Sequence, residues 1–328
     1  MNSDSEKHSP FTPPFWMRPA LVQTLIASMK FRKRGQHEME TQSNAMIFDC
    51  DDGVRLQGSY AYNSNNRALV IFLHGWEGSE NSTYVMSCAR YMYDRGCSVV
   101  RLNYRDHGDT HALNAAPFHA QRLTEVQNAV EQAAGLSNGA PVYVVGFSLG
   151  GNFALRIASR LKDSPIEGLK HIVSISPVID PWEASPLVDE NPLIRRYFYK
   201  KWTTSMKKKQ AAFPDLYDFS GVAQIKTVMG LTDMFLPAYT EFKDAAAYFN
   251  SYRIKPEDLL DCPVDVSVVM AKDDPVIPSE DVATLKTDER VKLVMTDHGG
   301  HNGFFTSLLG PTWYDTYIEA VMAQNVGA

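Results

Sequence analysis

Residues 145–152 read VGFSLGGN, so that three glycines surround a single serine. The stretch follows the apolar run PVYVV and precedes FALRIASRL, in which apolar residues recur at helical spacing. Glycine weakens a helix because it loses more backbone freedom on folding than other residues, so three at a helix start need a local reason. Gly-x-Ser-x-Gly between a strand and a helix predicts a tight turn that exposes the Ser148 hydroxyl at the strand end.

This turn, the nucleophile elbow, holds its serine in strained backbone angles, and Gly146 and Gly150 leave room for it. The hydroxyl then lies at the N-terminus of the next helix, where unpaired N–H groups and the helix dipole favour a developing negative charge. Ser148 is therefore the candidate nucleophile. The alternative is a glycine-rich turn that only packs closely against a strand.

A serine hydroxyl becomes a useful nucleophile only with a base and an acid beside it. After a serine elbow of this kind, the acid and then the histidine follow in the chain. Two later strand ends each offer a pair of candidates. AKDDPVIP contains Asp273 and Asp274, and TDHGGHNGF contains His298 and His301.

Position relative to the strand ends favours one member of each pair. Asp274 lies one residue farther past its strand than Asp273, where a loop carboxylate reaches over the sheet. Asp273 then reads as a turn or helix-capping residue. His301 follows a Gly-Gly pair that lets its loop approach the serine, whereas His298 lies nearer its strand. Asp180, after the strand HIVSIS, remains an alternative acid.

An oxyanion needs a second backbone donor from an earlier strand end, and residues 74–76 (HGW) follow the apolar strand ALVIFL. The N–H groups of Trp76 and Leu149 are predicted to form this oxyanion hole. His74 comes too early in the chain to be the base and is interpreted as a structural hydrogen-bonding residue. Residues 105–111, RDHGDTH, cluster two aspartates and two histidines but read as a loop, so no metal site is predicted.

Composition points to an ordinary globular protein, since the 328 residues are 44% hydrophobic and 21% charged. The net charge of −6 argues against a nucleic-acid partner. The four cysteines lack CxxC spacing, the first ten residues lack the features of a secretory signal, and no apolar run is long enough to cross a bilayer. We therefore expect a cytoplasmic protein with buried thiols and no cofactor.

Two strands joined by an Asp-Gly turn are predicted in AMIFDCDDGVRLQGSYAY, and six near-continuous apolar strands follow. The six are ALVIFLHG, CSVVRLNY, PVYVVGFS, LKHIVSIS, VDVSVVMAK and VKLVMTD. Between or after them helices are predicted near 82–95, 120–134, 149–162, 279–287 and 312–324. This alternation predicts an α/β fold with a mostly parallel sheet and helices on both faces.

The predicted domain organisation has three parts. Residues 1–44 form an N-terminal arm packed on the core, and residues 45–181 with 262–328 form the core. Residues 182–261 show no clear strand and are predicted to be a helical cap inserted before the acid-bearing strand. Within the cap, residues 195–209 carry seven Lys/Arg, no acids and four aromatics. We interpret this segment as a solvated basic helix face; the alternative is a lid that attracts anionic lipid or an acidic substrate.

Together these motifs resemble the alpha/beta-hydrolase superfamily and, within it, the YheT-like branch related to abhydrolase-domain serine esterases. The resemblance rests on FWMRPALVQT, HGWEGS, NYRDHGDT, GFSLGGN, AKDDPVIP and GGHNGF, and runs from about residue 11 to the C-terminus. It implies the alpha/beta-hydrolase fold, with Ser148 as nucleophile, Asp274 as acid and His301 as base. It also implies Trp76 and Leu149 as the oxyanion donors.

The chain departs from the branch at two places: Asp106 replaces a glycine, and residues 21–24 (LVQT) lack the branch's histidine. The resemblance implies a cofactor-free serine esterase acting on short- to medium-chain or lipid-like acyl esters through an acyl-enzyme on Ser148. Thioesterases and lipases or acylglycerol hydrolases share the triad, and an inactive binding module is the alternative of another class. The expected partner is a small ester, with no nucleic acid and no transmembrane segment; peripheral membrane contact stays open.

Overall fold

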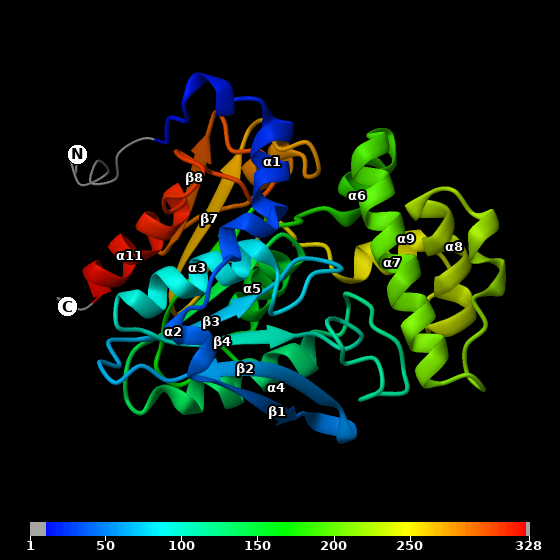
Figure 1. Ribbon diagram of the computed structural model, residues 1–328, viewed down its shortest axis with the longest axis horizontal. Helices are drawn as coiled ribbons and strands as arrows, with labels where there is room; N and C mark the ends of the chain where they lie inside the picture. The colour runs from blue at the N-terminus through cyan, green and yellow to red at the C-terminus, as the bar shows by residue number, and fades with distance from the viewer. Residues whose placement is uncertain (1–10, 326–328) are drawn as a thin grey trace.

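Eight strands form one sheet in the order β1-β2-β4-β3-β5-β6-β7-β8 (Figure 1). β2 is antiparallel to β1 and to β4, and all other neighbours are parallel. The strands are Ser43–Asp49 (β1), Arg55–Ala61 (β2), Leu69–Leu73 (β3), Ser98–Asn103 (β4), Val142–Phe147 (β5), Leu169–Ile175 (β6), Asp265–Ala271 (β7) and Val291–Thr296 (β8). β2 to β8 each lie within a predicted strand, and β1 begins at Ser43, two residues before its predicted start. The α/β fold with a mostly parallel sheet is confirmed.

The computed structural model describes residues 11–325. Residues 1–10, with the predicted start of the arm and the segment read as lacking a signal peptide, lie outside the described part, as do residues 326–328 at the end of the predicted core. Within the described range, no helix combines the length and apolar character needed to cross a bilayer.

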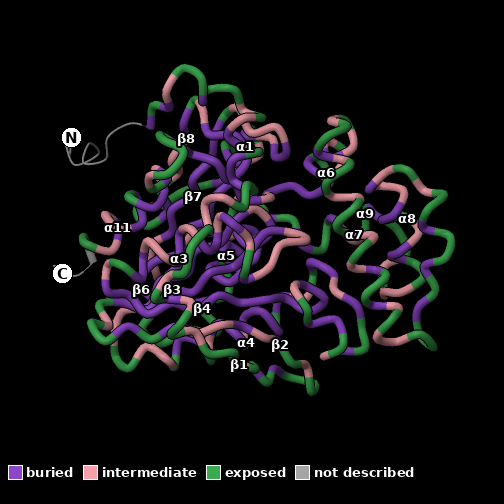
Figure 2. The backbone as a smooth tube through the Cα atoms, in the orientation of Figure 1, coloured by how far each residue is buried: buried purple, intermediate pink, exposed green. Residues whose placement is uncertain are grey.

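Alternate residues of the buried strands face opposite sides of the sheet, as strand geometry requires. In β3, Leu69 and Ile71 join one apolar cluster, whereas Val70 and Phe72 join the other. Helices cover both clusters, and Figure 2 shows the buried strands between them. On the first side lie α4 (Leu123–Ala134), α5 (Leu149–Arg160) and α10 (Ser279–Ala283); on the second lie α3 (Thr83–Asp94) and α11 (Trp313–Asn325).

The chain between β6 and β7 forms four helices, which lie together beside the sheet, at the right of Figure 1. They are α6 (Pro181–Glu190), α7 (Pro192–Ala212), α8 (Val228–Tyr239) and α9 (Ala245–Ser251), with a 3-10 turn, η5 (Ser220–Gln224). Apolar residues of this segment form a small cluster of their own that includes Phe219, Leu231 and Phe235. The helical content agrees with the prediction for this segment, whereas the domain boundaries stay a prediction.

The N-terminal segment packs beside the C-terminal end of β8. It contains η1 (Phe15–Met17), α1 (Ala20–Ser28), η2 (Lys30–Lys33) and α2 (Glu38–Thr41); two further 3-10 turns, η3 (Asp51–Gly53) and η4 (Gly135–Ser137), occur in the core. The buried Gln23 side chain donates to the carbonyl of Phe305 and accepts from its N–H, at 3.1 and 2.7 Å. Residues far apart in sequence are thereby joined next to the loop that carries His301.

Candidate active site

The elbow residue Ser148 lies between β5 and α5 with φ 54° and ψ −116°, a backbone conformation that is strained for a non-glycine residue. Glycine is needed at the positions around it because neighbouring backbone leaves no space there for a side chain. A Cβ on Gly146 would lie 2.2 Å from the Gly150 carbonyl oxygen, and one on Gly150 would lie 2.2 Å from that of Leu73. Each glycine therefore permits a close backbone approach that holds Ser148 above the sheet.

Replacing Gly150 with alanine is expected to lower the free energy of unfolding by about 3 kcal/mol or more, because its Cβ would overlap backbone that cannot rotate away. Gly135→Ala is the matched control, because no atom lies within 4 Å of its added Cβ and its φ of −60° suits alanine. The control should stay within about 1 kcal/mol of the parent. Urea unfolding measures both, and equal stability of the two variants would contradict the close packing described.

The three predicted triad side chains meet at the carboxyl ends of β5, β7 and β8. The Ser148 hydroxyl lies 2.9 Å from His301 Nε2, and His301 Nδ1 lies 2.8 Å from Asp274 Oδ2. The Asp274 side chain is fully buried and that of His301 is 9% exposed. The arrangement is a continuous hydrogen-bond chain from a hydroxyl to a buried carboxylate.

The Asp274 carboxyl is itself held in place by backbone donors. Its Oδ1 accepts from the N–H groups of Val276 and Ile277, at 2.8 and 3.0 Å. Its other oxygen therefore faces His301, which donates from Nδ1–H. The proton on Nδ1 leaves Nε2 as the acceptor for the Ser148 hydroxyl. The loop thus orients the carboxylate, and the carboxylate orients the imidazole.

The alternative acids, Asp273 and Asp180, and the alternative base, His298, make contacts outside the triad. Asp273 Oδ1 accepts from the N–H of Gly300 at 2.8 Å, and its Oδ2 lies 3.4 Å from His298 Nδ1. The second Asp–His pair therefore stands beside the first and braces the loop before His301. Asp180 caps the start of α6 and forms an ion pair with Arg253 at 2.8 Å.

Sequence reasoning missed the residues of α1 that hold the histidine loop. Thr24 Oγ1 accepts from the backbone N–H of His301 at 2.9 Å, and Gln23 binds Phe305 as described above. A Cβ on Gly300 would lie 2.4 Å from the Ala20 carbonyl oxygen, so the loop runs directly against the helix. Both residues belong to the LVQT motif, so the motif pointed to this helix. Its role in holding the histidine loop follows only from the contacts in the structure.

The loop after β3 passes close to Ser148, because a Cβ on Gly75 would lie 3.2 Å from the Ser148 Cβ. The next residue, Trp76, and the first residue of α5, Leu149, carry the predicted oxyanion donors. Within residues 11–325, neither N–H has a hydrogen-bond acceptor. Both remain available to a bound molecule.

Two buried histidines brace this loop and do not take part in the triad chain. His74 Nδ1 donates to the Gly75 carbonyl at 2.8 Å, and His107 Nε2 accepts from the N–H of Glu77 at 3.1 Å. Burial lowers the pKa of His74 well below its usual value and that of His107 to about 4, so both stay neutral near pH 7. Both act as structural hydrogen-bonding residues, as predicted for His74.

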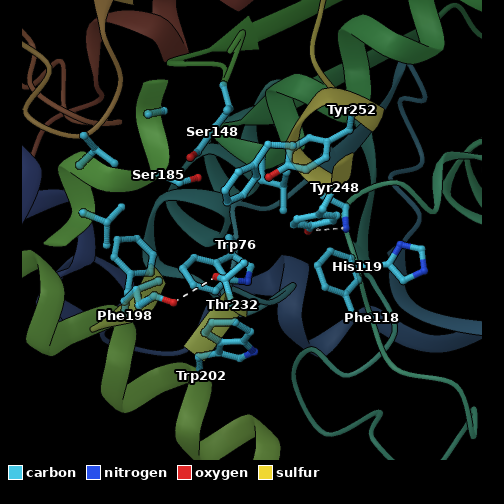
Figure 3. Close-up of a pocket in the computed structure, with 18 of the residues that line it drawn as sticks. Trp76, Phe118, His119, Ser148, Ser185, Phe198, Trp202, Thr232, Tyr248 and Tyr252 are labelled. Carbon is cyan, nitrogen blue, oxygen red and sulfur yellow. Dashed lines mark hydrogen bonds between the residues drawn. The ribbon is translucent and has the colours of Figure 1, made fainter. Parts of the chain in front are cut away.

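Two cavities meet at Ser148. The first, of about 110 Å³, lies beneath the helices between β6 and β7, and Figure 3 shows the aromatic side chains around it. The second, of about 130 Å³, lies between α1 and the start of α7, and His301 lines it. The stacked rings of Trp76 and Phe198, with centroids 5.3 Å apart, line both cavities.

The basic segment 195–209 has two different faces. Lys200 and Lys207 are exposed, as a solvated helix face requires. Lys209 is only 3% exposed and forms an ion pair with Asp106 at 2.8 Å, so the interpretation is wrong for this residue. Asp106, which replaces a glycine of the related branch, adopts φ 61° and is bound by Lys209 of α7. Among the described residues, no cluster of His, Cys, Asp and Glu suits a metal ion.

Comparisons with known proteins agree with this geometry. The model of the alpha/beta hydrolase family matches residues 70–308. The YheT protein of Escherichia coli (strain K12), which is named as an esterase, is 26% identical over 268 residues, covering 77% of each chain. Phospholipase ABHD3 of Bos taurus is 23% identical over 323 residues, covering 96% of this chain and 74% of its own.

Among solved structures, Est1E from Butyrivibrio proteoclasticus with bound ferulic acid superposes with a TM-score of 0.56 at 20% identity, over 86% of this chain and all of its own. At this identity the likeness shows the fold alone. The family match is decisive, since it spans most of the chain and includes the elbow and both loops of the triad. The chain belongs to the alpha/beta hydrolase family, in the branch that contains YheT and ABHD3.

Proposed function

We propose that this protein is a serine hydrolase that cleaves carboxylic esters through an acyl-enzyme on Ser148. The observation that carries the proposal is the hydrogen-bond chain from Ser148 through His301 to Asp274, which begins at a strained elbow. The names of the relatives, an esterase and a phospholipase, support ester hydrolysis as the reaction class.

In the first step His301 Nε2 takes the Ser148 proton while Oγ attacks the ester carbonyl carbon. The histidine becomes positively charged, and the buried Asp274 carboxylate stabilises that charge through Nδ1–H. The carbonyl oxygen becomes an oxyanion, for which the N–H groups of Trp76 and Leu149 are the proposed donors. Their lack of an acceptor within residues 11–325 supports this role.

In the second step His301 gives its proton to the alcohol oxygen, the C–O bond breaks, and the acyl group stays on Ser148. Water then attacks the acyl-enzyme, loses a proton to His301, and releases the carboxylic acid as the serine regains its proton. No cofactor enters either step.

The lining of the cavity beneath α6–α9 supports the proposal that this cavity binds the acyl group of the substrate. Its lining is largely aromatic and aliphatic and includes Phe235, Phe249 and Leu236. Such a wall suits the short- to medium-chain or lipid-like esters that the resemblance implies. Thioesters and acylglycerols share the same acyl chemistry and are the alternative substrates on this triad.

A fluorophosphonate probe tests the proposal directly, because it reacts only with a serine that its neighbours have activated. We expect the intact protein to be labelled once, the Ser148→Ala variant not to be labelled, and Ser185→Ala to label as the parent does. Ser185 lines the same cavity and is the matched control. An unlabelled parent protein would favour the inactive binding module, and labelling that survives Ser148→Ala would place the nucleophile elsewhere.

A further inference from the structure

Beyond the two apolar cavities, a third cavity of about 390 Å³ lies between α7 and the loops that follow β3 and β4. We refer to it as the lysine groove, because Lys200, Lys201 and Lys208 of α7 line it. We propose that the lysine groove binds an anionic group, phosphate or carboxylate, carried by the alcohol part of the ester substrate. This inference rests on the proposed function and specifies its substrate class.

The position of His301 in the triad determines which part of a bound ester lies towards the groove. His301 must protonate the alcohol oxygen as the alcohol leaves, so the alcohol lies on the side of Ser148 where the imidazole stands. His301 lines the second cavity and is not among the residues around the first. The acyl group therefore occupies the first cavity, beneath α6–α9, and the alcohol occupies the second.

The second cavity adjoins the lysine groove. Gly78 and Tyr197 line both, and Tyr197 lies on the same face of α7 as Lys200, Lys201 and Lys208. The Lys201 ammonium lies 5.6 Å from the centre of the Tyr197 ring, which places a cation at the junction. A substrate that extends from Ser148 past Tyr197 therefore passes from an apolar wall to a row of lysines.

The lysines keep capacity to bind a ligand. Lys201 donates one hydrogen bond to the Glu77 carbonyl, at 3.1 Å, which leaves two further N–H donors on the ammonium. Lys208 pairs with Asp109 at 2.8 Å, but the Asp109 side chain is 96% exposed, so water screens this pair strongly. Lys200 is exposed and lines the groove.

Other ionisable groups that line the groove do not cancel its positive charge. Asp106 is already neutralised by the buried Lys209. Burial raises the pKa of Glu77 to about 8, with Lys201 opposing the shift and Asp106 adding to it. Even when ionised, this one carboxylate is outnumbered by the three lysines. Burial lowers the pKa values of His107 and His111 to about 4, and both are neutral. The groove therefore presents a net positive charge to a substrate.

The kinetic test compares two soluble esters that differ only in one anionic group. One pair is glycerol monobutyrate and its phosphorylated counterpart. The other pair is the monobutyrate of hexanediol and its phosphate, in which a longer chain separates the ester from the phosphate. We expect the protein to prefer the phosphorylated member through a lower KM. In the variant with Lys200, Lys201 and Lys208 replaced by Gln, the ratio of kcat/KM between the two members should fall by about tenfold or more.

The matched control replaces Lys207, Lys226 and Lys243 by Gln, which removes the same charge from exposed positions outside the groove. Its ratio should stay within about twofold of the parent, since long-range charge is screened in salt. Equal losses in both variants would mean that the overall charge of the protein causes the effect, and would contradict binding in the groove. An effect confined to esters presented in anionic vesicles would also overturn it and assign the lysines to a membrane surface.

Binding without turnover separates this proposal from the proposed function. Hexyl phosphate and hexanol are titrated into the protein by calorimetry, with the groove variant and its control alongside. We expect hexyl phosphate to bind more tightly than hexanol, and only the groove variant to remove the difference. If ester hydrolysis persists in Ser148→Ala while this lysine-dependent binding is seen, the proposed function fails and the anion site stands. If hexyl phosphate binds no better than hexanol, the groove is rejected whatever the enzyme hydrolyses.

Discussion

Ser148→Ala is expected to reduce kcat for p-nitrophenyl butyrate by roughly five to six orders of magnitude, leaving a small residual rate above that in water. The loss is large because Ser148 and His301 act as a unit at 2.9 Å, and removing the hydroxyl leaves the base without a nucleophile to activate. The remaining rate would come from the backbone donors and from substrate binding, which the substitution leaves in place.

The measurement needs evidence that the variant is folded, since Ser148 holds a strained conformation with φ 54°. Alanine has no greater steric demand at this position, so thermal unfolding should occur close to the parent temperature. Ser185→Ala, on the wall of the same cavity, should keep activity within about tenfold. A folded Ser148→Ala protein with the parent's rate would exclude an acyl-enzyme at this residue.

The sheet was predictable because its central strands are buried on both faces. β3 and β5 consist of near-continuous apolar residues, and burial of both faces gives this pattern without the alternation of a half-exposed strand. The helices between them repeat apolar residues at helical spacing, so their positions also follow from the sequence. Apolar runs for the strands and helical periodicity for the helices were enough to predict this part of the fold.

The candidate triad could be predicted because each member sits in a short motif at a strand end. Its preferred members, Asp274 and His301, are the pair that the fold brings to Ser148. The contacts of Thr24 and Gln23 with the histidine loop were not predictable in the same way. They join residues more than two hundred positions apart, and only the folded chain reveals which loop α1 touches.

The shape of the substrate site depends on packing that no local motif encodes. The first cavity is lined by residues of five helices, α5 to α9, and of the loops after β3, β4, β6 and β7, so its walls follow from how those helices dock. The ion pair of Asp106 with Lys209 illustrates the same limit. One residue reads as a departure from a loop motif and the other as part of an exposed basic run, yet they neutralise each other in the interior.

Asp274→Asn is expected to lower kcat by about four orders of magnitude at neutral pH, by reversing the tautomer of His301. Asp274 serves three donors: the N–H groups of Val276 and Ile277 on one oxygen, and His301 Nδ1–H on the other. An asparagine has one oxygen, and the two backbone donors would hold it. Its NH2 group would then face Nδ1, which must become an acceptor, so the proton moves to Nε2 and the base can no longer accept from Ser148.

Asp273→Asn is the matched control, because it makes the same chemical change one residue away. Its carboxyl serves the Gly300 N–H and lies 3.4 Å from His298, so it shapes the loop without touching the triad. Loss of one such contact should cost less than about tenfold in kcat/KM. Both variants are compared on p-nitrophenyl butyrate after a check of the fold by circular dichroism. A larger loss in Asp273→Asn than in Asp274→Asn would reverse the assignment of the acid, because only the residue that sets the histidine tautomer can produce the larger effect.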